Sequence, residues 1–320
     1  MDIRVFTPEN LPIALGAVRA VDPLPTRDQD RFLRSVARLN GAELDPRALP
    51  VPSLAETARA VVDQHQRKRL VELAVIMATV DGFVLPVPTA NVTALGRALG
   101  VDEPEMHNLR RIAGDHRLLA RADLTRRVMG RFVGEVWQDE RFKGIARFVG
   151  PLFKASDDVA TGAKYRALEK LPKDSLGYAL FEHYRSNGFA FPGERGGLPE
   201  KAVFHDLGHV LSGYRTDPDG EIQQAAFQAG FVRNAGFMFL YFGVVQFHLG
   251  IKITPAADAE IGYFDVEKVM TALARGAACK VDLNDHWNFW PLLPRPLAEV
   301  RSELGVPPLE PRGTRRSRAA

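Results

Sequence analysis

Residues 201–221 read K-A-V-F-H-D-L-G-H-V-L-S-G-Y-R-T-D-P-D-G-E, and their spacing predicts both a local fold and a candidate site. If residues 202–214 are helical, His205 and His209 lie one turn apart on the same face. Asp206 precedes His209 by three residues, so the three side chains fit within about a third of the helix circumference. The stretch therefore predicts a short helix that presents two imidazoles and one carboxylate together.

A turn and a second carboxylate follow this helix. The sequence T-D-P-D-G at 216–220 is a strong turn signal that ends the helix. Glu221 then begins the next helix and can point back at the imidazoles. Two histidines with one or two carboxylates are a ligand set for a divalent metal. The candidate ligands are therefore His205, Asp206, His209 and Glu221. The alternative is a pair of core histidines beside a helix-capping aspartate.

The length and composition indicate a two-domain globular protein. A chain of 320 residues exceeds one average domain, and its 46% hydrophobic and 25% charged residues are ordinary for a globular protein. The net charge of +3 gives no argument for a nucleic-acid partner, and none is expected. The basic run is confined to the tail, 311–320, which is expected to be a disordered end that could favour an anionic membrane surface.

The cysteine usage favours a reducing compartment. Cys279 is the only cysteine, which excludes an intrachain disulfide and a thiolate zinc cluster, and it is expected to be a buried, inert thiol. Residues 1–10 lack the pattern of a signal peptide. We therefore expect a cytoplasmic location, with peripheral contact at the inner face of the membrane as a refinement.

The N-terminal half, 1–150, is predicted to be a helical domain with a Pro-rich arm. Prolines interrupt residues 1–55, where one or two short helices are expected, with a clear period only at 31–39. Ser53 and Glu56 have capping-box spacing before a long apolar-periodic run that continues to Val80.

Further helices complete this half. One is expected from Thr89 to Leu99, closed by Gly100, and another is expected to begin at Asp102. More helices are expected to fill 118–148.

The C-terminal half, 151–310, is also predicted to be helical, so the fold class is all-α with two helical domains. Helices are expected at 175–185, at 266–278 and at 296–304. Residues 223–253 form a long apolar stretch, and its core, 235–251, is a little short for a membrane span. It is predicted to be a buried core helix, or else the wall of a lipid-lined pocket or a membrane-facing helix. His248 within it is expected to be a hydrogen-bonded core histidine.

One stretch of the N-terminal half resembles a known family. Residues 70–100 contain V-E-L-A-V-I-M-A-T-V-D-G-F-V-L and end in A-L-G-R-A-L-G, which is similar to the tellurite-resistance TerB-like helical domains. The shared feature is the break between helices at Asp81-Gly82. The alternative is that this dipeptide is a helix C-cap and turn without chemistry.

The C-terminal half resembles the Coq-four family of ubiquinone (coenzyme Q) biosynthesis proteins. The family signature, H-D-x-x-H-x11-E, is matched at His205, Asp206, His209 and Glu221. The likeness begins near L-P at 171–172 and continues to the closing aromatic-Pro-Leu and Val-Arg segment. Residues 197–204 depart from the Arg-rich run that family members often carry there, which leaves the substrate open.

The resemblance implies an all-helical protein that binds a divalent metal and a polyprenylated ring intermediate at the inner face of a membrane. Zinc is the expected ion, with iron, manganese or magnesium as alternatives, and iron suits the ligand set better if dioxygen is used. Other ubiquinone-biosynthesis enzymes are the implied partners, and a homodimer is a further expectation. The family has been interpreted both as a scaffold and as an oxidative decarboxylase that replaces the ring carboxyl with a hydroxyl.

The roles of the individual residues follow from this interpretation. His205, His209 and Glu221 are expected to bind the metal directly. Asp206 is either a fourth ligand or the outer partner that fixes a histidine tautomer, and it is also the candidate catalytic group. The apolar stretch after Glu221 is expected to hold the lipid tail through Phe227, Phe231, Phe239 and Phe242.

Two rival interpretations remain open. The sequence F-H-D-L-G-H also looks like the centre of HD-domain phosphohydrolases, with His183 as the upstream histidine and Asp258 or Asp265 as the downstream aspartate. The second rival is a non-catalytic, lipid-binding scaffold for the biosynthetic enzymes.

Overall fold

The computed structural model describes residues 1–127, 158–197, 200–254, 257–284 and 287–309. These residues form helices and loops, and the described ranges contain no β-strand, only two isolated bridges, Ser175–Pro296 and Leu249–Ile261. The all-α prediction is confirmed.

The helices of the N-terminal half alternate with short connections. They are α1 (Leu11–Arg19), α2 (Arg27–Leu39), α3 (Leu54–Ala60), α4 (Gln64–Met77), α5 (Pro86–Leu99), α6 (Pro104–Ala113) and a helical segment at 117–127. The C-terminal half contains α8 (Val159–Arg166), α9 (Leu176–Asn187), α10 (Val203–Ser212), α11 (Pro218–Phe231), α12 (Phe237–Phe247), α13 (Val266–Ala277) and α14 (Leu297–Leu304). Short 3-10 helices lie at Pro46–Ala48, Ala167–Lys170, Glu200–Ala202 and Trp290–Leu292.

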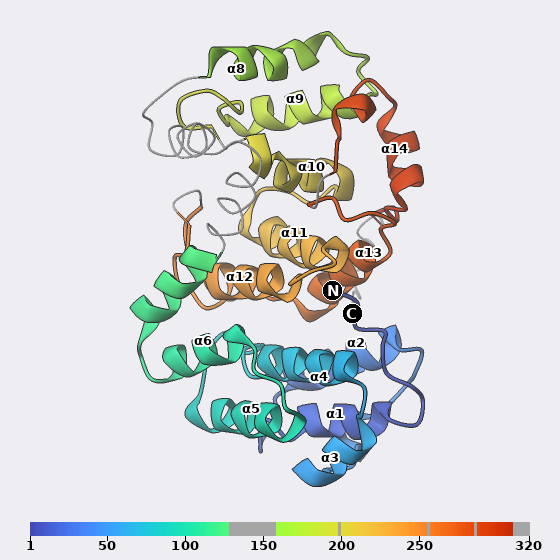
Figure 1. Ribbon diagram of the computed structural model, residues 1–320, viewed down its shortest axis with the longest axis vertical. Helices are drawn as coiled ribbons and strands as arrows, with labels where there is room; N and C mark the ends of the chain where they lie inside the picture. Colours follow the sequence, from blue (N-terminus) through green and yellow to red (C-terminus); the bar gives the residue numbers. More distant parts are fainter. Residues whose placement is uncertain (128–157, 198–199, 255–256, 285–286, 310–320) are drawn as a thin grey trace, which may run out of the picture.

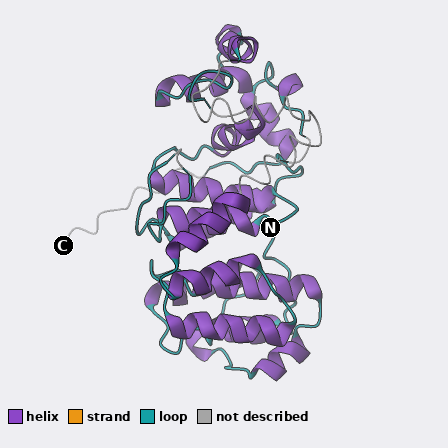
Figure 2. Ribbon diagram, turned by 60° about the vertical axis from the view of Figure 1, so that its left-hand side comes forward, coloured by secondary structure: helices purple, strands orange, loops and turns teal. Residues whose placement is uncertain are grey.

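The helices are stacked in layers along the long axis of the molecule (Figure 1). The N-terminal helices occupy one end, and α12 and α13 lie over them, followed by α11, α10, α9 and finally α8. Figure 2 shows the layered packing of the helices from another side. The two halves meet where α2 packs on α13, and there the Arg38 guanidinium and the Ser35 hydroxyl both bond Glu267. The buried hydrophobic residues form one continuous cluster through both halves. The division near residue 150 stays a prediction, because 128–157 lie outside the described residues.

The helix predicted from Ser53 to Val80 is wrong in its extent. The periodic run from Ser53 to Val80 is two helices, α3 and α4, because the chain turns at Val61. Asp63 caps the second helix, since its carboxylate accepts a hydrogen bond from the backbone N–H of Gln66. A side-chain cap of this kind begins a new helix even inside an apolar-periodic run. The capping box of Ser53 and Glu56 is confirmed.

Other boundaries in the N-terminal half differ by a few residues. The helix expected from residue 31 begins at Arg27, because Thr26 and Gln29 form a capping box. Gly100 closes α5 in the left-handed conformation, as predicted. Asp102 does not cap α6; Glu103 holds that position, and Asp102 pairs with His107. Of the helices expected at 118–148, the part beyond residue 127 lies outside the described residues.

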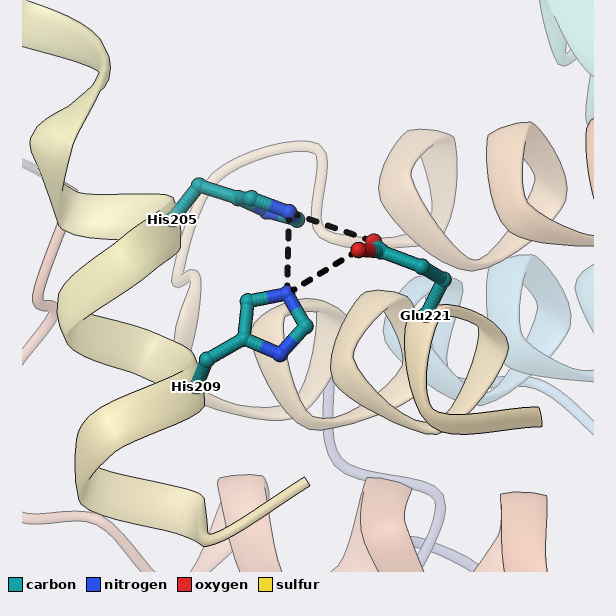
Figure 3. Close-up of side chains that lie close together, drawn as sticks. All are labelled: His205, His209 and Glu221. Atoms are coloured by element: carbon teal, nitrogen blue, oxygen red, sulfur yellow. Dashed lines mark hydrogen bonds and ion pairs between the residues drawn. The ribbon is translucent and has the colours of Figure 1, made fainter. Parts of the chain in front are cut away.

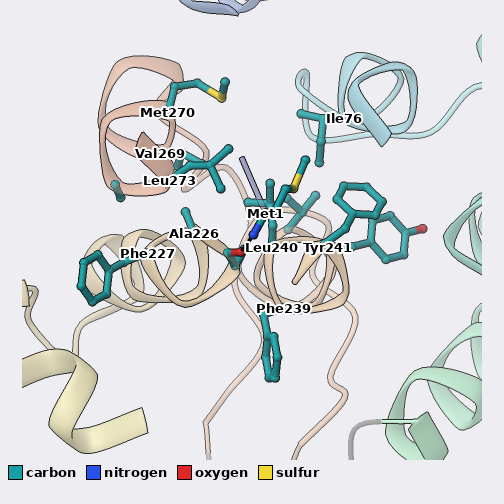
Figure 4. Packing of buried hydrophobic residues seen from close by; sticks show 14 of the residues in the cluster. Met1, Ile76, Ala226, Phe227, Phe239, Leu240, Tyr241, Val269, Met270 and Leu273 are labelled. Carbon is teal, nitrogen blue, oxygen red and sulfur yellow. Dashed lines mark hydrogen bonds between the residues drawn. The ribbon is translucent and has the colours of Figure 1, made fainter. Parts of the chain in front are cut away.

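The apolar stretch 223–253 is broken into two helices. Helix α11 ends at Phe231, and α12 begins at Phe237 after a turn that contains Ala235 at φ 56. Both helices are buried, which agrees with the core-helix prediction (Figure 4). None of the helices within the described ranges is long and apolar enough to cross a membrane.

Glycine sets the contact between α11 and α13. A Cβ on Gly276 would lie 1.9 Å from the Phe227 carbonyl oxygen, and one on Gly230 would lie 2.4 Å from the Leu273 carbonyl oxygen. Both distances are far below van der Waals contact, so only glycine permits this approach. The approach fixes α11, which carries Glu221, against the helix that meets the N-terminal half.

His248 joins the two halves, and its prediction as a core histidine is confirmed. Its Nε2–H donates to the Val80 carbonyl at 2.9 Å, and its Nδ1 accepts from the Phe264 amide at 3.1 Å. Both ring nitrogens are thus used by the neutral imidazole. Burial lowers the pKa of His248 despite the backbone carbonyl bonded to it and the nearby charges of Asp81 and Asp28.

We expect acid to weaken this junction. An unfolded histidine takes up its proton near pH 6.5, whereas folded His248 resists protonation. Its contribution to stability is therefore complete above about pH 6.5 and is lost as the pH falls, by at most about 1.4 kcal/mol per pH unit. Urea unfolding at pH 7.5 and 5.5 should show a smaller loss of stability for His248→Gln than for the parent. The exposed His116→Gln is the control, and equal losses in parent and His248→Gln would contradict this account.

Candidate metal centre

Two glycines allow α10 to present its histidines. A Cβ on Gly208 would lie 2.0 Å from the Gln224 Nε2, so the glycine leaves room for the buried Gln224 side chain between α10 and α11. Gly213 ends α10 in the left-handed conformation, at φ 81. With this helix formed, His205 and His209 lie on one face, one turn apart, as predicted.

The turn after α10 directs Glu221 back toward that face. Asp217 caps α11 by accepting a hydrogen bond from the Gly220 amide at 2.8 Å, and Pro218 occupies the first turn. A Cβ on Gly220 would lie 2.0 Å from the Arg215 carbonyl oxygen, so the tight turn requires glycine there. The predicted turn is therefore present, and Glu221 stands in the first turn of α11.

The two imidazoles and Glu221 converge (Figure 3). The Nε2 atoms of His205 and His209 are 3.2 Å apart, and the Glu221 carboxylate oxygens lie 3.4 Å from the first and 3.5 Å from the second. Ligand atoms bound tetrahedrally at about 2.0–2.2 Å lie roughly 3.3–3.6 Å from one another. One divalent ion therefore fits between these three groups, whose ligand atoms all lie within 4.8 Å of one another.

Hydrogen bonds on the outer ring nitrogens fix the orientation of both imidazoles. His205 Nδ1 donates to the Gln228 side-chain oxygen at 3.2 Å, and His209 Nδ1 donates to the Tyr214 carbonyl oxygen at 3.0 Å. Because carbonyl oxygens only accept, each Nδ1 carries a proton, so Nε2 is the nitrogen that offers a lone pair to a metal once the imidazole is neutral. With a metal bound, the arrangement would be that of two neutral ligands and one anionic ligand.

The charges of the three groups are strongly linked. Burial raises the pKa of Glu221, but hydrogen bonds from His205 and His209 outweigh it and lower that pKa to about 2. Burial lowers the pKa of His205, but Glu221 outweighs it and raises that pKa to about 9. A metal that binds at neutral pH therefore displaces a proton from His205.

The site is open on one side. The His209 side chain is 1% exposed, Glu221 is 17% exposed and His205 is 34% exposed. His205 is therefore the candidate ligand whose side chain is most exposed to solvent. A site with three protein ligands and an open side is typical of catalytic metals, whereas structural zinc is enclosed by four ligands.

Asp206 does not join the three ligands. Asp206 lies about 100° around α10 from His205, and its carboxylate contacts α9 instead of the ligand atoms. One of its oxygens accepts from the Tyr184 hydroxyl, and the other lies 3.4 Å from His183 Nε2. Burial raises its pKa, but His183, His205 and Tyr184 together lower it, so the group is ionised. In this arrangement Asp206 holds His183, and its expected roles as a fourth ligand or as the partner of a ligand histidine are not seen.

The Coq-four resemblance does not include His183 among the site residues, but the structure places it beside His209. Its ring is stacked on His209, with centroids 5.6 Å apart and an interplanar angle of 24°. The HD-type interpretation did select His183, but the aspartates that it also needs are engaged elsewhere. Asp258 pairs with Lys252, and Asp265 caps α13. The position beside both histidines is held by Glu221.

The four phenylalanines expected to bind a lipid tail differ in their surroundings. Phe227 and Phe231 are fully buried, Phe239 is nearly so, and Phe242 is half-buried. Figure 4 shows Phe227 on α11 and Phe239 on α12, projecting in different directions. A hollow of about 310 Å³ beside the site has polar walls, formed by His183, Asn187, Tyr214, Arg215, Thr216 and Asp217. Lipid binding stays a prediction, and Phe242 is the candidate with an accessible surface.

The comparisons with known proteins do not identify a family for the chain. No protein-family model matches the chain, and no curated protein matches it. The likeness to the Coq-four and TerB-like families accordingly stays a prediction from the motifs.

We expect the purified protein to hold about one divalent ion per chain and His209→Ala to lose it, because two of the three ligand groups do not retain a metal tightly. Elemental analysis after dialysis measures the ratio. His116→Ala, which removes an exposed histidine outside the site, should keep the ion. Equal metal in the parent and His209→Ala would refute the site.

Asp206→Asn should still bind the ion, because the carboxylate contacts Tyr184 and His183 rather than the ligand atoms. The loss of an outer hydrogen-bonded carboxylate usually costs about 10-fold to 100-fold in metal affinity, and less is expected here because no ligand is held directly. Competition with a chelator of known affinity measures the change. If Asp206→Asn loses metal as completely as His209→Ala does, Asp206 is a ligand after all.

Proposed function

We propose that the chain binds one divalent metal through His205, His209 and Glu221 and acts in ubiquinone biosynthesis, where it replaces the carboxyl of a polyprenylated ring intermediate with a hydroxyl. The observation that carries the proposal is the convergence of the three ligand atoms beside an open side at His205. The motif that links this site to ubiquinone biosynthesis is H-D-x-x-H-x11-E.

The proposed reaction breaks one bond and forms another at the same ring carbon. The carboxyl leaves as carbon dioxide, and a hydroxyl from water takes its place. The two electrons and two protons released pass to dioxygen, which becomes hydrogen peroxide. A bound metal supplies redox chemistry if it is iron, which two histidines and one carboxylate suit, or charge stabilisation if it is zinc. The proposal therefore favours iron for the oxidative reaction.

The residues of the chain contribute position and charge. Neutral His205 and His209 and anionic Glu221 leave a divalent ion with a net positive charge, which attracts a ring carboxylate or phenolate. The exposed side of His205 is the approach for the ring. The half-buried Phe242 on α12 offers apolar surface to the tail, where each buried methylene contributes about 0.8 kcal/mol.

An HD-type phosphohydrolase is the second candidate, and one observation favours it. His183 Nε2 lies 3.4 Å from Asp206, so the upstream histidine and the His-Asp pair of that motif are neighbours. A non-catalytic carrier of the same lipid is distinguished from the enzyme by the absence of product.

A turnover experiment tests the proposal. Protein loaded with ferrous iron is incubated with a prenylated hydroxybenzoate under dioxygen, and mass spectrometry follows the loss of the carboxyl and the gain of a hydroxyl. We expect product from the parent and none from Glu221→Gln, which removes the charged ligand. Bound substrate without product would favour the carrier. Phosphate release from nucleotides, without product from the aromatic acid, would favour the phosphohydrolase.

Organic extraction of the purified protein should release a prenylated quinone or ring precursor. Phe242→Asp should lower the amount of that lipid at least several-fold while leaving the metal content unchanged, because the carboxylate is placed on the apolar surface and away from the ligands. Phe83→Asp, at an exposed position of the N-terminal half, is the matched control. Equal lipid in all three proteins would exclude Phe242 from the lipid site.

A further inference from the structure

The carboxyl end of α10, the helix that carries both histidine ligands, is held by two arginines. Arg301 on α14 donates from Nε to the Leu211 carbonyl oxygen at 2.9 Å and from Nη2 to that of Val210 at 2.8 Å. Arg275 on α13 donates from Nη2 to the Ser212 carbonyl oxygen at 2.9 Å. The last turn of a helix leaves such carbonyl groups without partners inside the helix. The two guanidinium groups therefore complete the hydrogen bonding of α10.

The partners of these arginines are unusual for cations that are buried, as Arg275 is, or half-buried, as Arg301 is. Arg275 is 7% exposed, and in the described part of the chain both arginines bond carbonyl oxygens rather than carboxylates. Burial, and then the charge of Arg275, lowers the pKa of Arg301. A buried cation without an acidic partner is costly. The negative end of the α10 dipole is the compensating charge, so the arginines and the helix end stabilise each other.

Arg275 also contacts the segments that hold His209 and Glu221. Its guanidinium lies over the ring of Tyr214, 5.0 Å from the centroid, and 5.8 Å from the ring centroid of Phe227. The Tyr214 carbonyl oxygen accepts the Nδ1–H of His209, and Phe227 belongs to α11, the helix of Glu221. One side chain thus links the group that orients a histidine ligand to the helix that carries the carboxylate ligand.

The C-terminal segment completes this contact. The Pro307 carbonyl oxygen accepts from Arg275 Nη2 at 2.7 Å and from its Nε at 3.2 Å. The guanidinium is therefore held by hydrogen bonds along its edge and lies over two aromatic rings, a geometry that lysine cannot reproduce.

We propose that Arg275, assisted by Arg301, is a positioning residue that sets the metal affinity of the site by fixing His209 relative to Glu221. The inference rests on the metal binding proposed above. Arg275 acts without contacting the ion or the substrate. The carboxyl end of α10, at the opposite end of the helix from His205, thereby has a role in metal binding.

A different result is expected if the two arginines only stabilise the carboxyl end of α10. Its loss would lower the stability of the fold but leave the surroundings of a bound ion unchanged in the molecules that remain folded. A positioning role requires that the ion itself reports the substitution. The decisive readouts are therefore metal affinity and the spectrum of the metal, measured on folded protein.

Cobalt(II) is a suitable probe, because its visible absorption bands depend on the number and geometry of its ligands. The full-length parent, Arg275→Met, Arg275→Lys and Arg301→Lys are titrated with cobalt(II), and folding is checked by circular dichroism. Arg295→Met is the matched control, since Arg295 pairs with Glu303 at the surface. We expect Arg275→Met to bind cobalt(II) about tenfold or more weakly, as outer-shell changes usually do, with shifted absorption bands.

The lysine variants keep the proposal testable if Arg275→Met does not fold. They retain the positive charge at the helix end but lose the planar fork, so we expect Arg275→Lys to be folded, to bind cobalt(II) several-fold more weakly and to have shifted bands. Folded Arg275 variants with the affinity and spectrum of the parent would overturn the positioning role and leave the metal site standing. A parent that binds no cobalt(II) would overturn both.

Discussion

The close contact between α10 and α11 is the constraint on which the candidate site depends. Gly208 leaves room for the Gln224 side chain between the two helices, and the turn that ends at Gly220 returns the chain sharply enough for Glu221 to meet His205 and His209. Two helices in sequence thus provide all three ligand groups, and no distant segment is needed for them. The rest of the C-terminal half orients this pair of helices: α9 holds Asp206, and α13 and α14 hold the carboxyl end of α10.

The site could be predicted from the sequence because its ligands are local. A helical period places His205 beside His209, and a turn signal places Glu221 opposite them, so both inferences need only spacing. Asp206 and His183 show where spacing fails. The direction of Asp206 is decided by Tyr184 and His183, which come from α9, some twenty residues earlier in the chain. No local pattern contains a contact of that kind.

The fold shows the same division between local and distant information. Helical periodicity identified the all-α class, and capping signals such as Ser53 with Glu56 marked where helices begin. The break between α3 and α4 was missed because the hydrophobic period continues through it, while Asp63 starts a new helix. The apolar stretch after Glu221 looked continuous for a similar reason, although the chain turns near Ala235. Periodicity reports which face is buried and does not report where a helix changes direction.

The glycine contact between α11 and α13 has a consequence for how the protein tolerates variation. Gly276 admits no side chain because the Phe227 carbonyl oxygen occupies that space, and α13 is bonded in turn to α2 through Glu267. A larger residue at 276 must displace α11, and Glu221 is part of that helix. A screen for variants that lose their metal would therefore recover substitutions at a glycine that touches no ligand. Substitutions at Glu267, on the N-terminal side of the same helix, would be expected in that screen with milder effects.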